Sequence, residues 1–223
     1  MRLSPGKLAL MIDHTNLHAD ASKLDIEKLC DEGKMYNFNC VCVNPANIEL
    51  AVKNLLGSKT GICSVIGFPL GAVTSKAKIC EAEEAVLSGA SQLDMVMNIG
   101  QLKSGREDLV KQDIQGVVEA ADGRTVKVIL ETALLTEEEK VEACLISREA
   151  GAGFVKTSTG FSGLGGATVE DIKLIKKIVG NDMGIKASGG IKNLKQALEL
   201  INAGADRIGT SGGVQIMEEY ILK

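Results

Sequence analysis

The sequence predicts an α/β protein that folds as a TIM (β/α)8 barrel, on the basis of three observations. Short apolar runs alternate with helix-period segments eight times. A glycine closes the helical segment just before a strand at three places. The length of 223 residues fits one barrel, so we expect a single domain over residues 1–223. The predicted strands are Leu8–Asp13, Asn39–Val43, Gly61–Ile66, Gln92–Met97, Thr125–Leu130, Gly153–Thr157, Gly184–Ala187 and Asp206–Gly209.

Four of the helical segments between these strands begin with a Ser or Thr that is followed three residues later by an acidic residue. In such a capping box the hydroxyl accepts a bond from the third backbone N–H, and the acid bonds back to the first residue. The pattern predicts helix starts at Ser22/Asp25, Ser104/Glu107, Thr136/Glu139 and Thr168/Asp171.

A short repeat relates the register of the fourth, sixth and eighth strands. Each of Gly89, Gly151 and Gly204 precedes a predicted strand and is flanked by small residues. The residues five positions after these glycines are Asp94, Lys156 and Gly209. Because side chains alternate along a strand, these three positions face the barrel interior, and their apolar neighbours Leu93, Val155 and Ile208 face the helices.

The same alternation places an unusual number of charged side chains inside the barrel. These interior residues are Asp94, Lys127, Glu131, Lys156 and Lys186, with Asp13 at the end of the first strand. A barrel interior is normally filled by branched apolar side chains, and barrel enzymes place their active sites at the C-terminal ends of the strands. The sequence therefore predicts a catalytic site in this interior.

Lys156 is the candidate nucleophile, and Lys186 is its predicted neighbour. Two buried ammonium groups disfavour each other's charge and burial acts in the same direction, so at least one lysine should have a lowered pKa. A neutral lysine amine can attack a carbonyl carbon and form a Schiff base. Asp94 could move protons through a water molecule during that reaction. The alternative is that both lysines form structural ion pairs with Asp94 and Glu131.

Glycine-rich turns follow the last three predicted strands. Backbone N–H groups at such turns bind anions, and barrels often place a phosphate on the loops after strands seven and eight. The alternative is that these glycines only permit tight turns. The predicted phosphate-binding residues are Thr159, Gly160, Gly189, Gly190, Ser211 and Gly212. No segment has the spacing of a dinucleotide or Walker motif, so no nucleotide cofactor is expected.

Composition and charge exclude several classes of function. A net charge of −4, two tyrosines and four phenylalanines do not favour nucleic-acid binding. The longest apolar runs are too short to cross a membrane, and no cleavable leader follows the first residues, so we expect a cytoplasmic protein.

Cysteine and histidine patterns do not indicate a metal site. Six cysteines lack any Cys-x-x-Cys pair, and His14 and His18 lack a nearby acidic cluster, so we expect no metal ion. The two histidines are interpreted as structural or surface residues. Cys42 faces inward near the catalytic end of its strand, either as a thiol within reach of substrate or as a small core side chain.

The strand ends resemble those of the class I deoxyribose-phosphate aldolases over essentially the whole chain. The matching segments begin at Ile12-Asp13-His14-Thr15, Val41-Cys42-Val43-Asn44-Pro45, Val65-Ile66-Gly67-Phe68-Pro69, Leu93-Asp94-Met95, Val128-Ile129-Leu130-Glu131-Thr132, Phe154-Val155-Lys156-Thr157-Ser158-Thr159-Gly160, Lys186-Ala187-Ser188-Gly189-Gly190 and Ile208-Gly209-Thr210-Ser211. The resemblance implies a barrel enzyme that reversibly cleaves 2-deoxy-D-ribose 5-phosphate to acetaldehyde and D-glyceraldehyde 3-phosphate, without a metal or other cofactor, and that forms homo-oligomers.

The resemblance also implies roles for individual residues. Lys156 matches the Schiff-base lysine, Asp94 the acid/base carboxylate, and Lys186 the lysine that keeps the nucleophile neutral. Supporting polar residues around the sugar hydroxyls and the catalytic water match Asp13, Lys127 and Thr132.

Two positions depart from some members of the family. Phe161 stands where some members have a lysine. Tyr220 is followed by three residues, whereas some members end in a tyrosine. Phosphate binding is therefore expected to depend more on backbone amides and Ser211 than on a cation.

Two other functions compete with the aldolase prediction. One is a phosphosugar isomerase on the same barrel, which would use a carboxylate base and would not form an imine. The other is a barrel that binds a phosphorylated metabolite without turnover, in which case a ligand would raise the melting temperature only.

Overall fold

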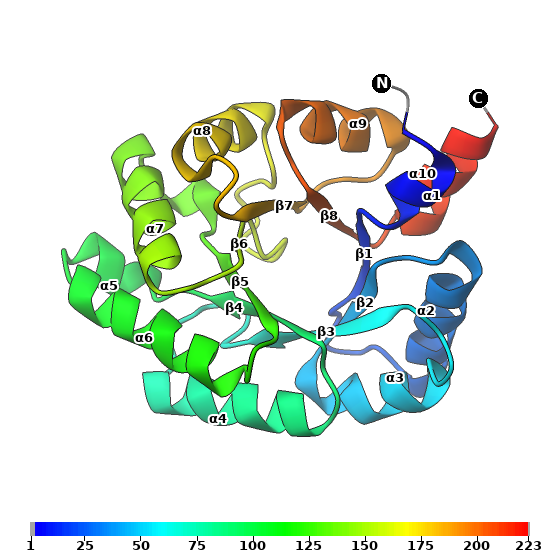
Figure 1. Ribbon diagram of the computed structural model, residues 1–223, viewed down its shortest axis with the longest axis horizontal. Helices are drawn as coiled ribbons and strands as arrows, with labels where there is room; N and C mark the ends of the chain where they lie inside the picture. The colour runs from blue at the N-terminus through cyan, green and yellow to red at the C-terminus, as the bar shows by residue number, and fades with distance from the viewer. Residues whose placement is uncertain (1–2, 223) are drawn as a thin grey trace.

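The computed structural model describes residues 3–222, which form a closed barrel of eight parallel strands (Figure 1). Neighbours in the sequence are neighbours in the barrel, and β8 pairs with β1 to close it. The strands are β1 Ile12–Asn16, β2 Cys40–Val43, β3 Gly61–Ile66, β4 Gln92–Val96, β5 Thr125–Ile129, β6 Phe154–Lys156, β7 Gly184–Ser188 and β8 Arg207–Thr210. The predicted fold class is thereby confirmed.

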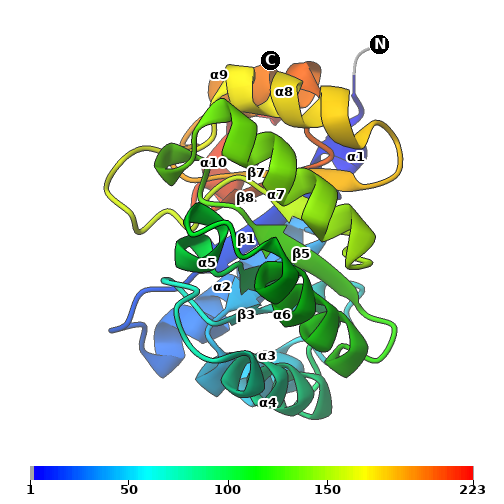
Figure 2. The ribbon, with the colours of Figure 1, turned by 90° about the vertical axis from the view of Figure 1, so that its left-hand side faces the viewer.

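The helices surround the barrel and cover the outer faces of its strands (Figures 1 and 2). The α-helices are α1 Pro5–Ala9, α2 Lys23–Tyr36, α3 Ile48–Asn54, α4 Ser75–Leu87, α5 Ile99–Lys103, α6 Glu107–Ala120, α7 Glu137–Glu149, α8 Val169–Val179, α9 Leu194–Ala203 and α10 Gly213–Ile221. Short 3-10 helices lie at η1 Pro45–Asn47 and η2 Thr132–Leu134. Within residues 3–222, no helix is both long enough and apolar enough to cross a membrane.

The prediction of a first strand at Leu8–Asp13 is wrong in its first half. Ser4 caps a short helix there by accepting a hydrogen bond from the Lys7 N–H, and Pro5 occupies the first helical turn. Leu8 and Ala9 are buried as the inner face of α1, which packs against α10. Their apolar run therefore serves a helix, and the strand begins at Ile12. The ends of the other seven strands agree with the prediction to within one residue.

Three of the four predicted helix starts are confirmed. Ser22 and Thr136 form complete capping boxes, and the Thr168 side chain accepts a bond from the Asp171 N–H. The prediction at Ser104 is wrong, because α6 begins after Arg106 and the Ser104 hydroxyl instead donates to the Gly100 carbonyl at 2.7 Å.

The predicted alternation of side chains is confirmed at the register-defining strands. Leu93, Val155 and Ile208 belong to the main core cluster of buried apolar residues. A second, smaller cluster consists of Leu17, Cys40, Cys42, Cys63 and Val65, and we call it the thiol wall. It comes from β2, β3 and the residue after β1, whereas β4 to β7 supply most of the interior charges.

Candidate active site

Asp94 on β4 is the centre of the interior charge cluster. Its side chain is fully buried and accepts hydrogen bonds from three lysine ammonium groups. Lys127 Nζ lies 2.9 Å from Oδ1, and Lys156 Nζ and Lys186 Nζ each lie 2.8 Å from Oδ2. Burial raises the pKa of this carboxyl, but the three ammonium groups outweigh burial and hold the pKa well below its ordinary value. Asp94 is therefore ionised in the resting site.

Asp13 on β1 is a second buried carboxylate beside the first. Its Oδ2 lies 2.6 Å from Lys186 Nζ and 3.9 Å from Lys127 Nζ. Its Oδ1 accepts a bond from Asn39 Nδ2 at 2.9 Å and lies 3.5 Å from a guanidinium nitrogen of Arg207. Burial raises the pKa of Asp13, but Lys186 and the other cations outweigh burial and lower it. Lys186 is thus shared between two carboxylates.

The expected lowering of a lysine pKa does not occur at Lys186 or Lys127. Burial lowers the pKa of both groups, but for Lys186 the carboxylates of Asp13 and Asp94 more than compensate, and for Lys127 chiefly Asp94 does so. Both pKa values are therefore raised. At Lys186 the second carboxylate, Asp13, acts with Asp94 to outweigh burial, and it lies on the first strand, far from the others in sequence.

Glu131 does not take part in the charge cluster, in contrast to its predicted position beside the lysines. It follows β5 in a left-handed conformation with φ 55°. Its carboxylate accepts bonds from the backbone N–H and the hydroxyl of Thr159, the N–H lying 3.2 Å from Oε2. The role of Glu131 is therefore to hold the loop after β6. The adjacent Thr132 is buried, and within residues 3–222 its hydroxyl has no hydrogen-bond partner.

Gly209 on β8 makes room for the lysine cluster. A Cβ atom at this position would lie 2.8 Å from Lys186 Cε and 2.5 Å from Ser188 Oγ. Real Cβ atoms essentially never approach so closely. The bare backbone predicted to face the interior is therefore required by the position of Lys186.

A pocket of about 280 Å³ opens above this cluster at the C-terminal end of the barrel. Lys156 reaches it from below and is 3% exposed, whereas Lys127 and Lys186 are fully buried. The predicted phosphate residues that line the pocket are Thr159, Gly160, Gly189, Gly190 and Ser211. Gly212 is not among the lining residues, and its N–H is already used in a 2.8 Å bond to Thr210 Oγ1. Asp13, Asp94, Cys42, Lys127, Thr132 and Lys186 lie outside the lining as well.

Sequence reasoning missed several residues of the pocket wall. Thr15, His18 and Lys192 line it, as does Ser188. Lys192 supplies a cation on the same loop as Gly189 and Gly190. It follows that glycine pair by two residues, and this spacing is visible in the sequence. His14, by contrast, is buried and bonds to Glu32 at 2.7 Å, in line with a structural role.

The two departures from the family pattern lie in different places. Phe161 lines the pocket and packs edge-on against Phe68, with ring centroids 5.2 Å apart. The Tyr220 hydroxyl donates to the Leu3 carbonyl, so this tyrosine is engaged with the N-terminal segment. An aromatic ring thus stands in the pocket wall at the position where the resemblance led us to expect a cation.

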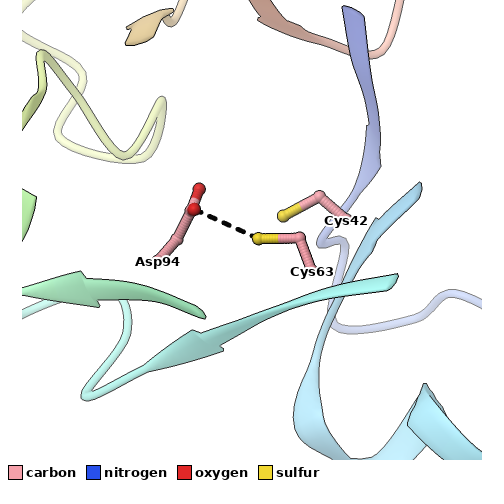
Figure 3. A group of neighbouring side chains, drawn as sticks. All are labelled: Cys42, Cys63 and Asp94. Carbon is pink, nitrogen blue, oxygen red and sulfur yellow. Dashed lines mark hydrogen bonds between the residues drawn. The ribbon is translucent and has the colours of Figure 1, made fainter. Parts of the chain in front are cut away.

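Cys42, Cys63 and Asp94 bring three possible metal ligands within 4.8 Å of one another (Figure 3). Both oxygens of Asp94 already accept bonds from ammonium groups. A cation at this point would have to displace them against the charge of the lysines. The donor set therefore fits the existing ion pairs better than a metal ion.

The chain matches known proteins over nearly its whole length. The model of the DeoC/LacD family aldolases matches residues 7–218. The deoxyribose-phosphate aldolase of Methanothermobacter thermautotrophicus is 61% identical over 214 residues, covering 96% of this chain and 95% of that one. The enzyme of the same name from Streptococcus sanguinis is 58% identical over 212 residues, covering 95% and 96%.

Solved structures agree with these matches. The tetrameric deoxyribose phosphate aldolase from Aeropyrum pernix superposes with a TM-score of 0.91 at 35% identity, covering 98% of this chain and 92% of that one. Similarity in sequence and in structure thus coincides with an interior that holds buried lysines and carboxylates beneath a polar pocket. The chain belongs to the DeoC/LacD family of aldolases.

Proposed function

We propose that this protein is a class I deoxyribose-phosphate aldolase in which Lys156 forms the Schiff base. One observation carries the assignment of the nucleophile. Of the three lysines that bond to Asp94, Lys156 alone lines the pocket, while Lys127 and Lys186 are sealed beneath it. A substrate carbonyl can therefore reach the Lys156 amine and not the other two.

The first proposed step is a proton transfer between groups that already touch. The Lys156 ammonium donates to Asp94 Oδ2 at 2.8 Å. Transfer of that proton gives a neutral amine and a neutral carboxylic acid. The amine attacks C1 of the open-chain sugar, and the acid returns its proton to the carbinolamine hydroxyl, which leaves as water. Lys186 and Lys127 remain charged and restore the Asp94 carboxylate as the preferred state afterwards.

The second proposed step breaks the carbon–carbon bond. The protonated imine withdraws the electron pair of the C2–C3 bond, while a base accepts the proton of the C3 hydroxyl. Glyceraldehyde 3-phosphate leaves, and an enamine of acetaldehyde stays on Lys156. Protonation of the enamine at C2 and addition of water then release acetaldehyde. We assign the proton movements to Asp94 acting through a water molecule.

Phosphate binding is assigned to the far wall of the pocket. Gly189 and Gly190 both have positive φ values, 86° and 76°, which glycine adopts readily and which turn the backbone sharply beside the pocket. Ser211 adds a hydroxyl, and Lys192 adds a positive charge on the same wall. A phosphorylated substrate is thus favoured over a neutral sugar.

The test is reduction with borohydride in the presence of 2-deoxyribose 5-phosphate, followed by digestion and mass analysis. We expect the added two-carbon or five-carbon fragment on Lys156, and its loss together with turnover in Lys156→Ala. Lys173→Ala, at an exposed lysine of α8, is the matched control and should behave like the wild type. An adduct on another lysine would contradict the assignment. An active enzyme that borohydride does not affect would instead favour an isomerase.

We further infer that the protein is a homo-oligomer in the cytoplasm. The tetrameric relative from Aeropyrum pernix supports the first point, and the six free cysteines found within residues 3–222 support a reducing compartment. Light scattering coupled to gel filtration tests the assembly, and a mass equal to one 23.5 kDa chain would contradict it.

A further inference from the structure

Cys63 lies at the boundary between the thiol wall and the charge cluster. It is fully buried on β3, in register with Cys42 on β2 and with Gln92 on β4. Its Sγ lies 3.1 Å from Asp94 Oδ1 and 3.5 Å from Lys127 Nζ (Figure 3 shows the first of these contacts). It is the member of the thiol wall that reaches both partners of the Asp94–Lys127 pair.

The contact between Cys63 and Asp94 requires a proton between the two atoms. A thiolate 3.1 Å from a carboxylate oxygen would be repelled, whereas a thiol donates to it. The sulfur in turn accepts a bond from Lys127, so the three groups form a closed triangle.

This triangle determines which way the Asp94 carboxylate faces. Oδ1 is held by Cys63 and Lys127, and Oδ2 is left toward Lys156 and Lys186. The other members of the thiol wall have apolar or thiol side chains, and both Cys63 and Asp94 are fully buried. Loss of the S–H donor would therefore leave Lys127, among residues 3–222, as the remaining side-chain donor to Asp94 Oδ1.

We propose that Cys63 is a positioning residue of the aldolase reaction, because its thiol donates to Asp94 Oδ1 and so keeps Oδ2 directed at the Lys156 amine. The inference rests on the proposed function of Lys156 as the nucleophile. Cys63 does not touch the pocket, so it acts through Asp94 and not on the substrate.

Three variants separate the donor from the packing of the sulfur atom. Cys63→Ala removes the donor, Cys63→Ser keeps a donor of similar size, and Cys144→Ala removes a buried thiol from α7, outside the barrel. We expect Cys63→Ala to lower kcat by about 10- to 100-fold with little change in KM, the effect of losing one hydrogen bond to a charged group. Cys63→Ser should recover most of that loss, and Cys144→Ala should retain the kcat of the wild type.

A pre-steady-state measurement distinguishes this proposal from the function on which it rests. The rate at which borohydride traps substrate on Lys156 should fall in Cys63→Ala, while the trapped amount reaches the same end point. If the wild type forms no adduct on Lys156, the proposed function fails. If the adduct forms equally fast in the wild type and in Cys63→Ala, only the role of Cys63 fails.

The infrared S–H stretching band reports the hydrogen bond itself and does not depend on turnover. In the wild type, the Cys63 band, identified by its loss in Cys63→Ser, should lie at the low frequency of a strong donor. Absence of that band at neutral pH would show a thiolate and would overturn the proposal. Equal losses of kcat in the alanine and serine variants would also overturn it.

Discussion

One added methyl group at Gly209 tests whether the barrel interior is packed to fix Lys186. In Gly209→Ala the new Cβ would lie 2.8 Å from Lys186 Cε, about 0.6 Å inside the 3.4 Å at which ordinary contact begins. Lys186 cannot simply retreat, because its Nζ is held by Asp13 at 2.6 Å and by Asp94 at 2.8 Å. Either these bonds lengthen or the two strands separate.

Comparable effects on activity and on stability are expected. Overpacking a well-filled interior costs about 1–3 kcal/mol of unfolding free energy. A misplacement of about 1 Å at a catalytic group can cost roughly 100-fold in rate, so a shift near 0.6 Å should lower kcat by about 10- to 100-fold. The assay couples the glyceraldehyde 3-phosphate released from 2-deoxyribose 5-phosphate to NADH oxidation, and urea unfolding gives the stability.

Gly6→Ala is the matched control, because a Cβ there meets no atom within 4 Å. The double variant Gly209→Ala/Ser188→Ala removes the 2.5 Å contact with Ser188 Oγ and leaves the contact with Lys186. It should regain part of the lost stability and keep the low kcat. Wild-type kcat in Gly209→Ala, at unchanged stability, would refute the argument that the space beside Lys186 is filled.

Three further predictions concern charge and exposure. Asp94→Asn should abolish turnover and cost about 3–5 kcal/mol, because it leaves buried lysines without their shared carboxylate. Since the folded pKa of Asp94 lies well below the ordinary 3.8, the ionised group stabilises the fold fully above about pH 5, and the difference between wild type and variant in urea unfolding should shrink only in stronger acid. A difference that already shrinks between about pH 7 and pH 5 would contradict this. Lys192→Ala should raise KM for 2-deoxyribose 5-phosphate by about two- to fivefold and leave unphosphorylated 2-deoxyribose unaffected, as steady-state kinetics would show; equal effects on both substrates would exclude a phosphate contact. Ellman's reagent at neutral pH should modify the exposed Cys80 first, because burial raises the pKa of Cys30 to about 11 and of Cys144 to about 12, and a rapid reaction of several thiols would be inconsistent with that burial.

The sequence alone determined the barrel and the identity of its interior charges. Alternation along a strand is a local property, so the positions of Asp94, Lys156 and Lys186 on the inner face followed from their neighbours. The same local reasoning failed at Leu8–Ala9, where an apolar run can serve a strand or the buried face of a helix, and packing of α1 against α10 decided between them.

Only the tertiary structure decided which of the charged interior side chains form ion pairs or hydrogen bonds with one another. Lys186 is shared between Asp94 and Asp13, and Glu131 holds Thr159 instead of a lysine. These partners depend on the stagger of strands around the closed barrel and on distances of a few ångströms in a medium of low dielectric constant, neither of which a linear pattern contains. The raised pKa of Lys186 and the contact of Cys63 with Asp94 follow from the same three-dimensional arrangement.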